Sequence, residues 1–417
     1  MSSQVTPKDS CIISICDSPS SISARTVTNE IALVERGQSN ANANEEFLQA
    51  IAEIYKPVLR LLKLSGVYFG STTFATTIYP SNQGKGNLLF RFYCGIVVVG
   101  LWFDFLMPVV SVFCGADIYL NIMNLGWCLL VALLGTTCLI VLPSTSTKAS
   151  GFENFIRKVS STEIEIPRLA KVKSRSRMYL ILFLLYAMVS LAGAFVTDLL
   201  LQLNIGNAWP WKRWPVFRII SLIVLSCSCG VWFFPIAFFC TTCLILETLF
   251  DNFHKKTSLP HSANSLDIAY LRQQHHSLCQ VVDFADRLFS PLLLEVVGFS
   301  IPVMCFNFYQ LIHSQNVKDI AFVISVLFWL LSSATIMAAV LINGSRVNEK
   351  IHAVQKILQP LPIATEDEGK LLIFLMDLHG EPRGLSIGGL SVITKSLSIT
   401  VVGVIISYAA VILSLPG

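Results

Sequence analysis

Seven long apolar segments follow one another along the chain, and polar or basic stretches separate them. A helix needs roughly 20 predominantly apolar residues to cross the hydrocarbon core of a bilayer, and each segment reaches that length. The pattern therefore predicts an all-α, polytopic membrane protein with seven transmembrane helices. The expected spans are residues 88–112, 118–142, 178–203, 216–248, 286–313, 319–342 and 390–415.

The segments outside the spans differ from one another in character. Residues 1–44 are rich in Ser, Asn, Thr and Ala and have no hydrophobic run, which is typical of a disordered tail and not of a signal peptide. Residues 45–70 place apolar side chains at helical spacing opposite basic ones, which predicts an amphipathic helix with an interruption or kink near Pro57. The predicted organisation is a tail at 1–44, this helix at 45–70, spans one to six within 88–342, anchor helices at 343–389 and the last span within 390–417.

The distribution of Lys and Arg among the loops predicts the orientation of the spans. Basic residues accumulate in cytoplasmic loops. The 143–177 loop is strongly basic, whereas the 113–117 loop has no basic residue, so the two lie on opposite sides. The 251–280 and 343–388 loops fall on the basic side. With seven spans, the N-terminus is cytoplasmic and the C-terminus is extracellular, which is the opposite of a G-protein-coupled receptor.

The composition supports a membrane protein and argues against soluble classes. Hydrophobic residues make up 53% of the chain, charged residues 13%, and the mean hydropathy is +0.65. The net charge of +4 follows from the asymmetric loops, so we expect no nucleic-acid partner. No known catalytic motif is present, which predicts no enzyme activity and no cofactor. Cys240 and Cys243 have a zinc-like spacing but no second pair, so no metal site is predicted.

Several ionisable residues lie at positions where the bilayer would make a charge costly. Asp198 and Glu295 fall deep in the third and fifth spans, where an acid is a functional candidate, with structural pairing equally open. Lys395 is expected at the cytoplasmic end of the last span, where its ammonium snorkels or pairs with an anchor carboxylate. His275 and His276 fall in a predicted cytoplasmic segment, so we expect both on a solvated face.

The last span is unusual because small residues recur among its Val, Ile and Leu residues. Such a composition permits either close helix packing or a narrow, partly polar pore lining, and the residues alone leave both options open. The small residues are Ser396, Ser398, Thr400, Gly403, Ser407, Ala409, Ala410 and Ser414.

The chain resembles the insect gustatory and odorant receptor superfamily, in its gustatory-receptor-like branch. The last-span signature of that family is Thr-Tyr, five hydrophobic residues and Gln-Phe, and here Ser407 and Tyr408 precede five hydrophobic residues and then Ser414. Residues 53–70 resemble the short N-terminal helix of the family. Replacement of Gln by Ser and of Phe by Leu indicates a divergent member. Further landmarks upstream match at His379, Pro382, Gly388, Thr394, Lys395, Ser396 and Leu397.

The resemblance implies a chemosensory, ligand-gated, non-selective cation channel in the plasma membrane. Four copies of the last helix would line a central pore in a homotetramer or a heterotetramer with related subunits, and cytoplasmic helices would join the subunits. By position, Val411 falls at the gate and Ser414 at a polar constriction, with Ser407 and Tyr408 on the same helix. His379 and Lys395 belong to the anchor. Monovalent cations would pass, with divalent cations as a further option.

In that family each subunit holds a small organic ligand in its outer half, so we expect a pocket among the outer halves of spans two to six. Apolar walls with a few polar groups suit such a ligand. The pocket candidates are Asn124, Trp127, Asp198, Gln202, Trp232, Phe233, Phe306 and Tyr309.

Three other functional classes stay open at this stage. A non-conducting seven-helix scaffold or a secondary transporter could share the span pattern, although no paired repeat typical of transporters is visible. An orphan G-protein-coupled receptor is the third option, and the predicted orientation and the missing receptor signatures argue against it.

Overall fold

The computed structural model describes residues 49–69, 84–113, 118–142, 152–160, 162, 169–204, 215–258, 267–313, 320–359, 368–380 and 382–414. These residues belong to a unit that covers Phe47–Gly417. The predicted tail at 1–44 lies outside the described residues. Helices dominate the described part of the chain, in the order α2 (Gly84–Phe113), α3 (Ile118–Val141), α4 (Phe152–Ser160), α5 (Leu169–Asn204), α6 (Pro215–Ser258), α7 (Ile268–His313), α8 (Ile320–Leu358), α9 (Glu368–His379) and α10 (Lys395–Ser414).

Seven of these helices correspond to the predicted spans. In the described part of the chain, α2, α5, α6, α7, α8 and α10 are long and apolar enough to cross a membrane. The helix α3 has 24 residues, which also suffices for a crossing. The all-α, seven-helix membrane fold is therefore confirmed.

Three of the helices are much longer than a bilayer requires. Helices α6, α7 and α8 have 44, 46 and 39 residues, so each measures roughly 60–70 Å, against about 30 Å for the hydrocarbon core. The extensions of α6 and α7 occupy much of the 251–280 segment, where the sequence pattern predicted a loop. That prediction was wrong because the polar extensions are stabilised by packing on neighbouring helices, which a hydropathy pattern does not report.

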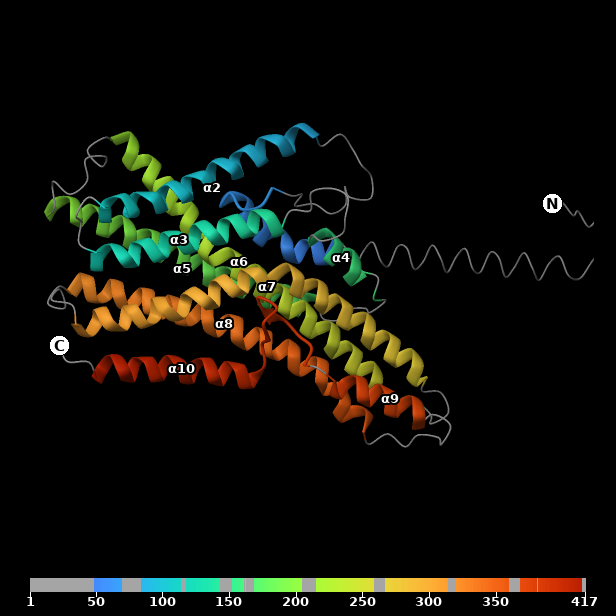
Figure 1. The fold of residues 1–417 in the computed structure, drawn as a ribbon. Coiled ribbons are helices and arrows are strands. Elements are labelled where there is room, and N and C mark those ends of the chain that lie inside the picture. The colour runs from blue at the N-terminus through green and yellow to red at the C-terminus, as the bar shows by residue number, and fades with distance from the viewer. Residues whose placement is uncertain are drawn as a thin grey trace, which may run out of the picture. The chain divides into compact units, whose positions relative to one another are not determined.

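The helix α6 lies at the centre of the bundle, because it contacts α2, α3, α5, α7 and α8. Its Phe238 and Phe239 both pack against Phe289 of α7, with ring centroids 5.3 Å apart in each pair. Figure 1 shows α10 at the edge of the bundle with α8 as its neighbour, while α9 lies beside the far ends of α7 and α8.

The predicted N-terminal helix is present at residues 49–64 and continues through Pro57. Its apolar face is fully buried, and Ile51, Tyr55 and Val58 have 0% exposure. The Tyr55 hydroxyl donates to Thr242 Oγ1 of α6 over 3.0 Å. The helix is therefore packed on protein through its apolar face, and its basic residues lie on the other side.

The strongly basic loop at 143–177 contains a short helix that the sequence pattern did not predict. The helix α4 buries Phe152, Phe155, Ile156 and Val159 and exposes Arg157. The Phe152 ring meets Tyr55 edge-on, with centroids 4.8 Å apart. This amphipathic helix forms because the N-terminal helix and α6 supply an apolar surface for its buried face.

The connection from α9 to α10 is a β-hairpin, which replaces the start of the last span predicted at residue 390. Strand β1 (Ser386–Ile387) pairs antiparallel with β2 (Ser391–Val392), with Ser386 opposite Val392. Gly388 and Gly389 occupy the turn with φ of +63° and +71°, a region in which residues with a Cβ are strained. The membrane helix consequently begins only at Lys395.

His275 is buried, so the expected solvated face is wrong for this residue. It is 5% exposed, and its Nε2 atom lies 3.2 Å from the Ile351 carbonyl oxygen of α8. Its ring also meets Phe253 and Phe374 at 5.8 and 5.6 Å. The neighbouring His276 is exposed, as expected. His275 is buried because α7 already begins at Ile268, so the residue lies within this helix and faces α6, α8 and α9.

Candidate functional site

The helix α10 packs against α7 and α8 through one face only. Val401 is buried on that face, and Leu397 and Ile405 pack against the core beside it. The opposite face of the helix is exposed and carries Ser407 and Ser414. Within the described part of the chain, this leaves a long face of α10 without a contact to its own bundle.

The predicted gate residues both lie on exposed parts of α10. Val411 is 57% exposed, Ser414 is also exposed, and they point about 60° apart around the helix. Tyr408 is 55% exposed, whereas Ile412 is half-buried.

The hydroxyls of α10 are hydrogen-bonded within the helix. Ser407 Oγ donates to the Gly403 carbonyl over 2.9 Å, and Ser414 Oγ donates to the Val411 carbonyl over 2.7 Å. Each donated hydrogen is thereby satisfied, while the oxygen lone pairs stay available as acceptors. A stripe of such hydroxyls presents weakly negative oxygens, which suits a partly polar surface in contact with cations or water.

The base of α10 and the end of α9 are both tied to the extension of α8. Lys395 forms an ion pair with Glu349 of α8. His379, at the end of α9, bonds the Leu375 carbonyl through Nδ1 over 3.0 Å and meets Gln355 of α8 through Nε2 over 3.1 Å. The two predicted anchor residues therefore both connect neighbouring elements to α8.

The hairpin before α10 is clamped to α7. The Ser386 N–H and hydroxyl both donate to Asp286 Oδ1, over 2.5 and 2.8 Å. The Gly388 N–H donates to the Ser290 carbonyl over 3.0 Å. A Cβ atom at Gly388 would lie 2.9 Å from a Leu294 methyl group. The turn is thus pressed against α7 so closely that a glycine is required.

The helix α8 also contacts the segment between α9 and α10, which includes the hairpin. Asn348 Nδ2 donates to the Arg383 carbonyl over 2.7 Å. Gly344 faces Ile393, whose methyl group would lie 2.9 Å from a Cβ at the glycine position. The segment at the base of α10 therefore contacts both α7 and α8.

Aromatic side chains from α3, α5, α6 and α8 meet inside the bundle. The Trp127 ring lies 5.1 Å from Trp232 and 4.6 Å from Trp329. Phe233 stacks on Tyr186 at 5.9 Å. Phe328 links the two groups, because it contacts Tyr186 at 6.3 Å and Trp329 at 5.7 Å. These six residues are called the aromatic cluster below.

The cluster includes a polar atom without a partner. Trp232 is 1% exposed, and its Nε1 atom makes no hydrogen bond within the described part of the chain. A buried donor without an acceptor destabilises the fold by roughly 1–3 kcal/mol. The Tyr186 hydroxyl, by contrast, pairs with Thr335 Oγ1 over 3.0 Å. The indole N–H is therefore a buried donor without an acceptor among the described residues.

The structure brings together only some of the predicted pocket residues. Trp127, Trp232 and Phe233 belong to the aromatic cluster. Phe306 and Tyr309 form a separate pair on α7, with ring centroids 6.4 Å apart. The side chains of Asn124, Asp198 and Gln202 lie outside the described residues.

Two polar residues of α7 stand out within the membrane bundle. Asn307 is 0% exposed, and neither of its amide atoms has a hydrogen-bond partner among the described residues. Glu295 accepts a hydrogen bond from Thr137 of α3 through Oε1, while its buried Oε2 makes none within the described ranges. The sequence pattern indicated Glu295 but not Asn307, Tyr186 or Trp329. An amide in an otherwise apolar span was the available signal for Asn307.

Comparisons with known proteins agree with this fold. A family model described as 7tm Chemosensory receptor matches residues 55–413. The structure of the insect olfactory receptor OR5 from Machilis hrabei superimposes with a TM-score of 0.69 at 11% identity, over 87% of this chain and 97% of that one. The same receptor in complex with eugenol gives 0.68 at 10% identity, over 89% and 98%. None of the curated proteins matches the chain.

Proposed function

The chain belongs to the 7tm chemosensory receptor family, and from this premise we propose that it is a plasma-membrane channel that a small organic ligand opens to cations. Four subunits, identical or related, surround one pore, and each contributes α10 to its lining. Val411 forms the gate, and Ser414 forms a polar ring beside it. Membership of the family confirms the predicted resemblance, and the chain is accordingly a multi-pass membrane chemoreceptor.

The observation that carries this proposal is the exposed face of α10. A helix that served only to complete its own bundle would bury its small residues, where they permit close approach. Here Ser407 and Ser414 lie on the face that points away from α7 and α8. One subunit has no second wall for an ion path along that face, so the proposed pore requires further copies of α10.

The aromatic cluster supports the ligand part of the proposal. Its rings offer a large apolar contact area, and the Trp232 N–H offers one directional donor, which is the usual composition of a small-molecule site. The relative's structure is described as a complex with eugenol, a small aromatic molecule. We extend that chemistry to this chain and propose an aromatic or similarly apolar ligand with one hydrogen-bond acceptor.

Contacts of the hairpin with α7 connect the proposed ligand site to the proposed pore. The helix α7 carries Asp286 and Ser290, which hold the hairpin, and it packs along α3 and α8, which carry Trp127 and Trp329. A ligand that shifts these aromatic rings would bias α7 and α8, and with them the base of α10. In this proposal, the hairpin together with α7 and α8 is the element with two arrangements that ligand gating requires.

Recordings from cells that express the full chain test the proposed function. Small aromatic ligands, with eugenol as the first probe, should evoke an inward cation current that untransfected cells lack. A variant with Asp286→Asn, which weakens the clamp, should reach the surface and give a smaller current at the same ligand concentration. Ligand-dependent substrate uptake without a current would favour a transporter, and ligand binding without either would favour a scaffold.

A further inference from the structure

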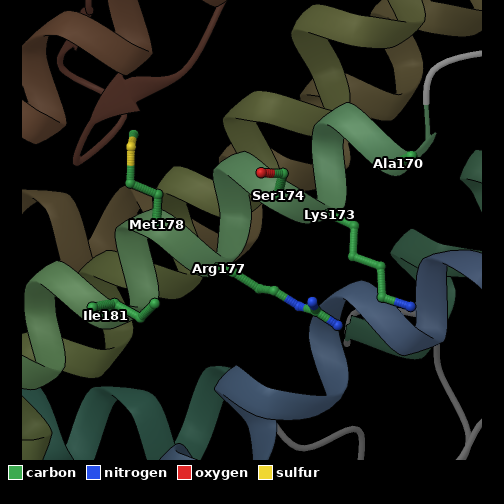
Figure 2. A pocket seen from close by; sticks show the side chains of 6 residues that line it. All are labelled: Ala170, Lys173, Ser174, Arg177, Met178 and Ile181. Atoms are coloured by element: carbon green, nitrogen blue, oxygen red, sulfur yellow. The ribbon is translucent and has the colours of Figure 1, made fainter.

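A hollow of about 600 Å³ lies against the first turns of α5. All of its lining side chains come from one stripe of that helix, in which Ala170 is followed by polar and basic residues and then by apolar ones. Figure 2 shows Lys173 and Arg177 reaching from α5 toward the helix at 49–64. The lining residues are Ala170, Lys173, Ser174, Arg177, Met178 and Ile181.

Lys173 and Arg177, the two basic side chains of the hollow, differ in whether they form an ion pair. Lys173 forms an ion pair with Glu53 of the N-terminal helix, and its ammonium lowers the pKa of that carboxyl. The positive charge of Lys173 is thereby largely compensated. Arg177 is exposed and makes no ion pair within the described part of the chain. Its guanidinium lies within electrostatic reach of Glu53 but makes no direct ion pair, so its N–H groups stay available as donors at the mouth of the hollow.

Further basic residues surround this position, and few acidic ones do. On the N-terminal helix and α5, Glu53 is the acid whose side chain is described, and it is already paired. On α6, which also packs on α5, Glu247 lies near Arg346 and Arg175, and Asp251 pairs with Lys350. The basic residues of the N-terminal helix are Lys56, Arg60 and Lys63, and α5 adds Lys171, whereas Arg175 of α5 lies near Glu247 of α6. The surroundings thus favour a ligand with negative charge.

An apolar track continues from the hollow along α5. Met178, Ile181 and Leu185 are 59%, 58% and 58% exposed, and they follow one another at helical spacing. Met188 and Val189 extend the track, with exposures of 57% and 52%. From Arg177 to Val189 the helix rises by about 18 Å, close to the roughly 15 Å depth of hydrocarbon in one leaflet. One acyl chain can therefore pack along this track.

We propose that this surface binds an anionic phospholipid of the inner leaflet. The phosphate accepts hydrogen bonds from Arg177, in the bidentate geometry that guanidinium groups favour, and from the Ser174 hydroxyl. One acyl chain lies along Met178, Ile181 and Leu185. The inner leaflet is implied because the 143–177 segment is on the basic, cytoplasmic side, where anionic lipids are concentrated. The apolar track distinguishes a phospholipid from a soluble phosphate, which would use the basic end alone.

Lipid titration of the purified full-length protein, followed by native mass spectrometry, tests the assignment. Phosphatidylserine and phosphatidylcholine with the same acyl chains serve as the two probes. Both lipids carry the phosphate, but the choline cation of phosphatidylcholine compensates its charge, so the wild type should retain the net-negative phosphatidylserine about tenfold more strongly. Arg177→Gln should remove this preference. Arg175→Gln is the matched control, because it removes the same charge from the same helix at a position that does not line the hollow. It should leave the preference intact.

Two further experiments distinguish a phospholipid at this surface from a soluble anion and from lipid bound at other helices. Millimolar inorganic phosphate should leave phosphatidylserine retention unchanged, and full competition would overturn the lipid assignment in favour of a soluble anion. Phosphatidylserine with a photoreactive group in one acyl chain should label wild-type residues 178–189. This measurement does not depend on the folding of a variant. The proposal would be contradicted if both variants lost the preference for phosphatidylserine equally, or if labelling occurred only at other helices.

Discussion

At the scale of single residues, the position of Val411 makes the gate proposal testable. In the proposed tetramer, Val411→Ser should make the proposed constriction wettable, because a hydroxyl binds water and a methyl group does not. The variant should show ligand-independent current several-fold above wild type, measured in whole cells and normalised to surface expression.

The neighbouring Ile412 provides the control for this change. Ile412 is half-buried, toward the face that packs on the bundle. Ile412→Ser should therefore lower expression without raising the basal current. If both substitutions raised the basal current equally, the exposed face of α10 would not line the gate.

Ser414 tests the selectivity of the same pathway. Ser414→Glu adds a ring of carboxylates in a tetramer, which should attract divalent cations and strengthen their permeation or block. Reversal potentials in sodium-based and calcium-based solutions measure the change, and Ser414→Gln provides a neutral control of the same size. Identical reversal potentials for the Glu and Gln variants would place Ser414 outside the ion path.

Trp232 tests the aromatic cluster. Trp232→Phe retains an aromatic ring but removes the unpartnered N–H, so the ligand concentration for half-maximal current should rise by about fivefold or more. Trp102→Phe is the matched control, because the Trp102 indole donates to Thr136 Oγ1 and lies outside the cluster. A control that shifts the concentration dependence as much as Trp232→Phe would count against the assigned ligand position.

At the scale of secondary-structure elements, the hairpin between α9 and α10 depends on its two turn glycines for different reasons. Both have positive φ, but only Gly388 is pressed against Leu294, whereas the space around Gly389 is open. Gly388→Ala should destabilise the protein by about 1–3 kcal/mol more than Gly389→Ala, since only the first adds a steric collision to the backbone strain.

Thermal unfolding of the two purified glycine variants in the same detergent gives this comparison. The shared backbone strain cancels in the difference, so the remainder reports the contact with α7. Equal melting temperatures would mean that the hairpin is not clamped on α7 as described.

At the scale of the whole molecule, exposed apolar residues on α9 are where we expect the subunits of the proposed tetramer to meet. This helix buries Phe374 and Leu378 against its own subunit and leaves Leu372 and Met376 60% and 67% exposed outside the predicted membrane spans. We predict a four-fold assembly joined mainly by residues 347–400. Met376→Glu should shift the particle in nanodiscs from four subunits toward one, measured by light scattering or mass photometry.

Lys256→Glu provides the control for the assembly experiment. It changes an exposed side chain of α6 outside the proposed interface, so it should leave the mass unchanged. A wild-type protein that is monomeric both in mild detergent and in nanodiscs would contradict the tetramer and, with it, the pore.

The number and order of the membrane helices could be predicted from the sequence because the bilayer imposes a strict requirement. Each span must satisfy its backbone polar groups internally and present about 20 apolar residues, and both demands are local. The relation between Val411 and Ser414 was equally local, because residues three apart lie near one another on any helix. The amphipathic helix at 49–64 followed from its own periodicity for the same reason.

Only the tertiary structure decided which of these residues meet. The burial of His275, the formation of α4 and the clamp between Ser386 and Asp286 all depend on partners far away in the chain, and no local pattern encodes such partners. The same holds for the aromatic cluster, in which Trp127 and Trp232 meet beside Trp329 and Tyr186, residues absent from the predicted set. Every membrane helix is apolar on most faces, so hydropathy cannot tell a face that packs on protein from one that contacts lipid or lines a pore; only the arrangement of α7 and α8 beside α10 distinguishes the packed face from the exposed one.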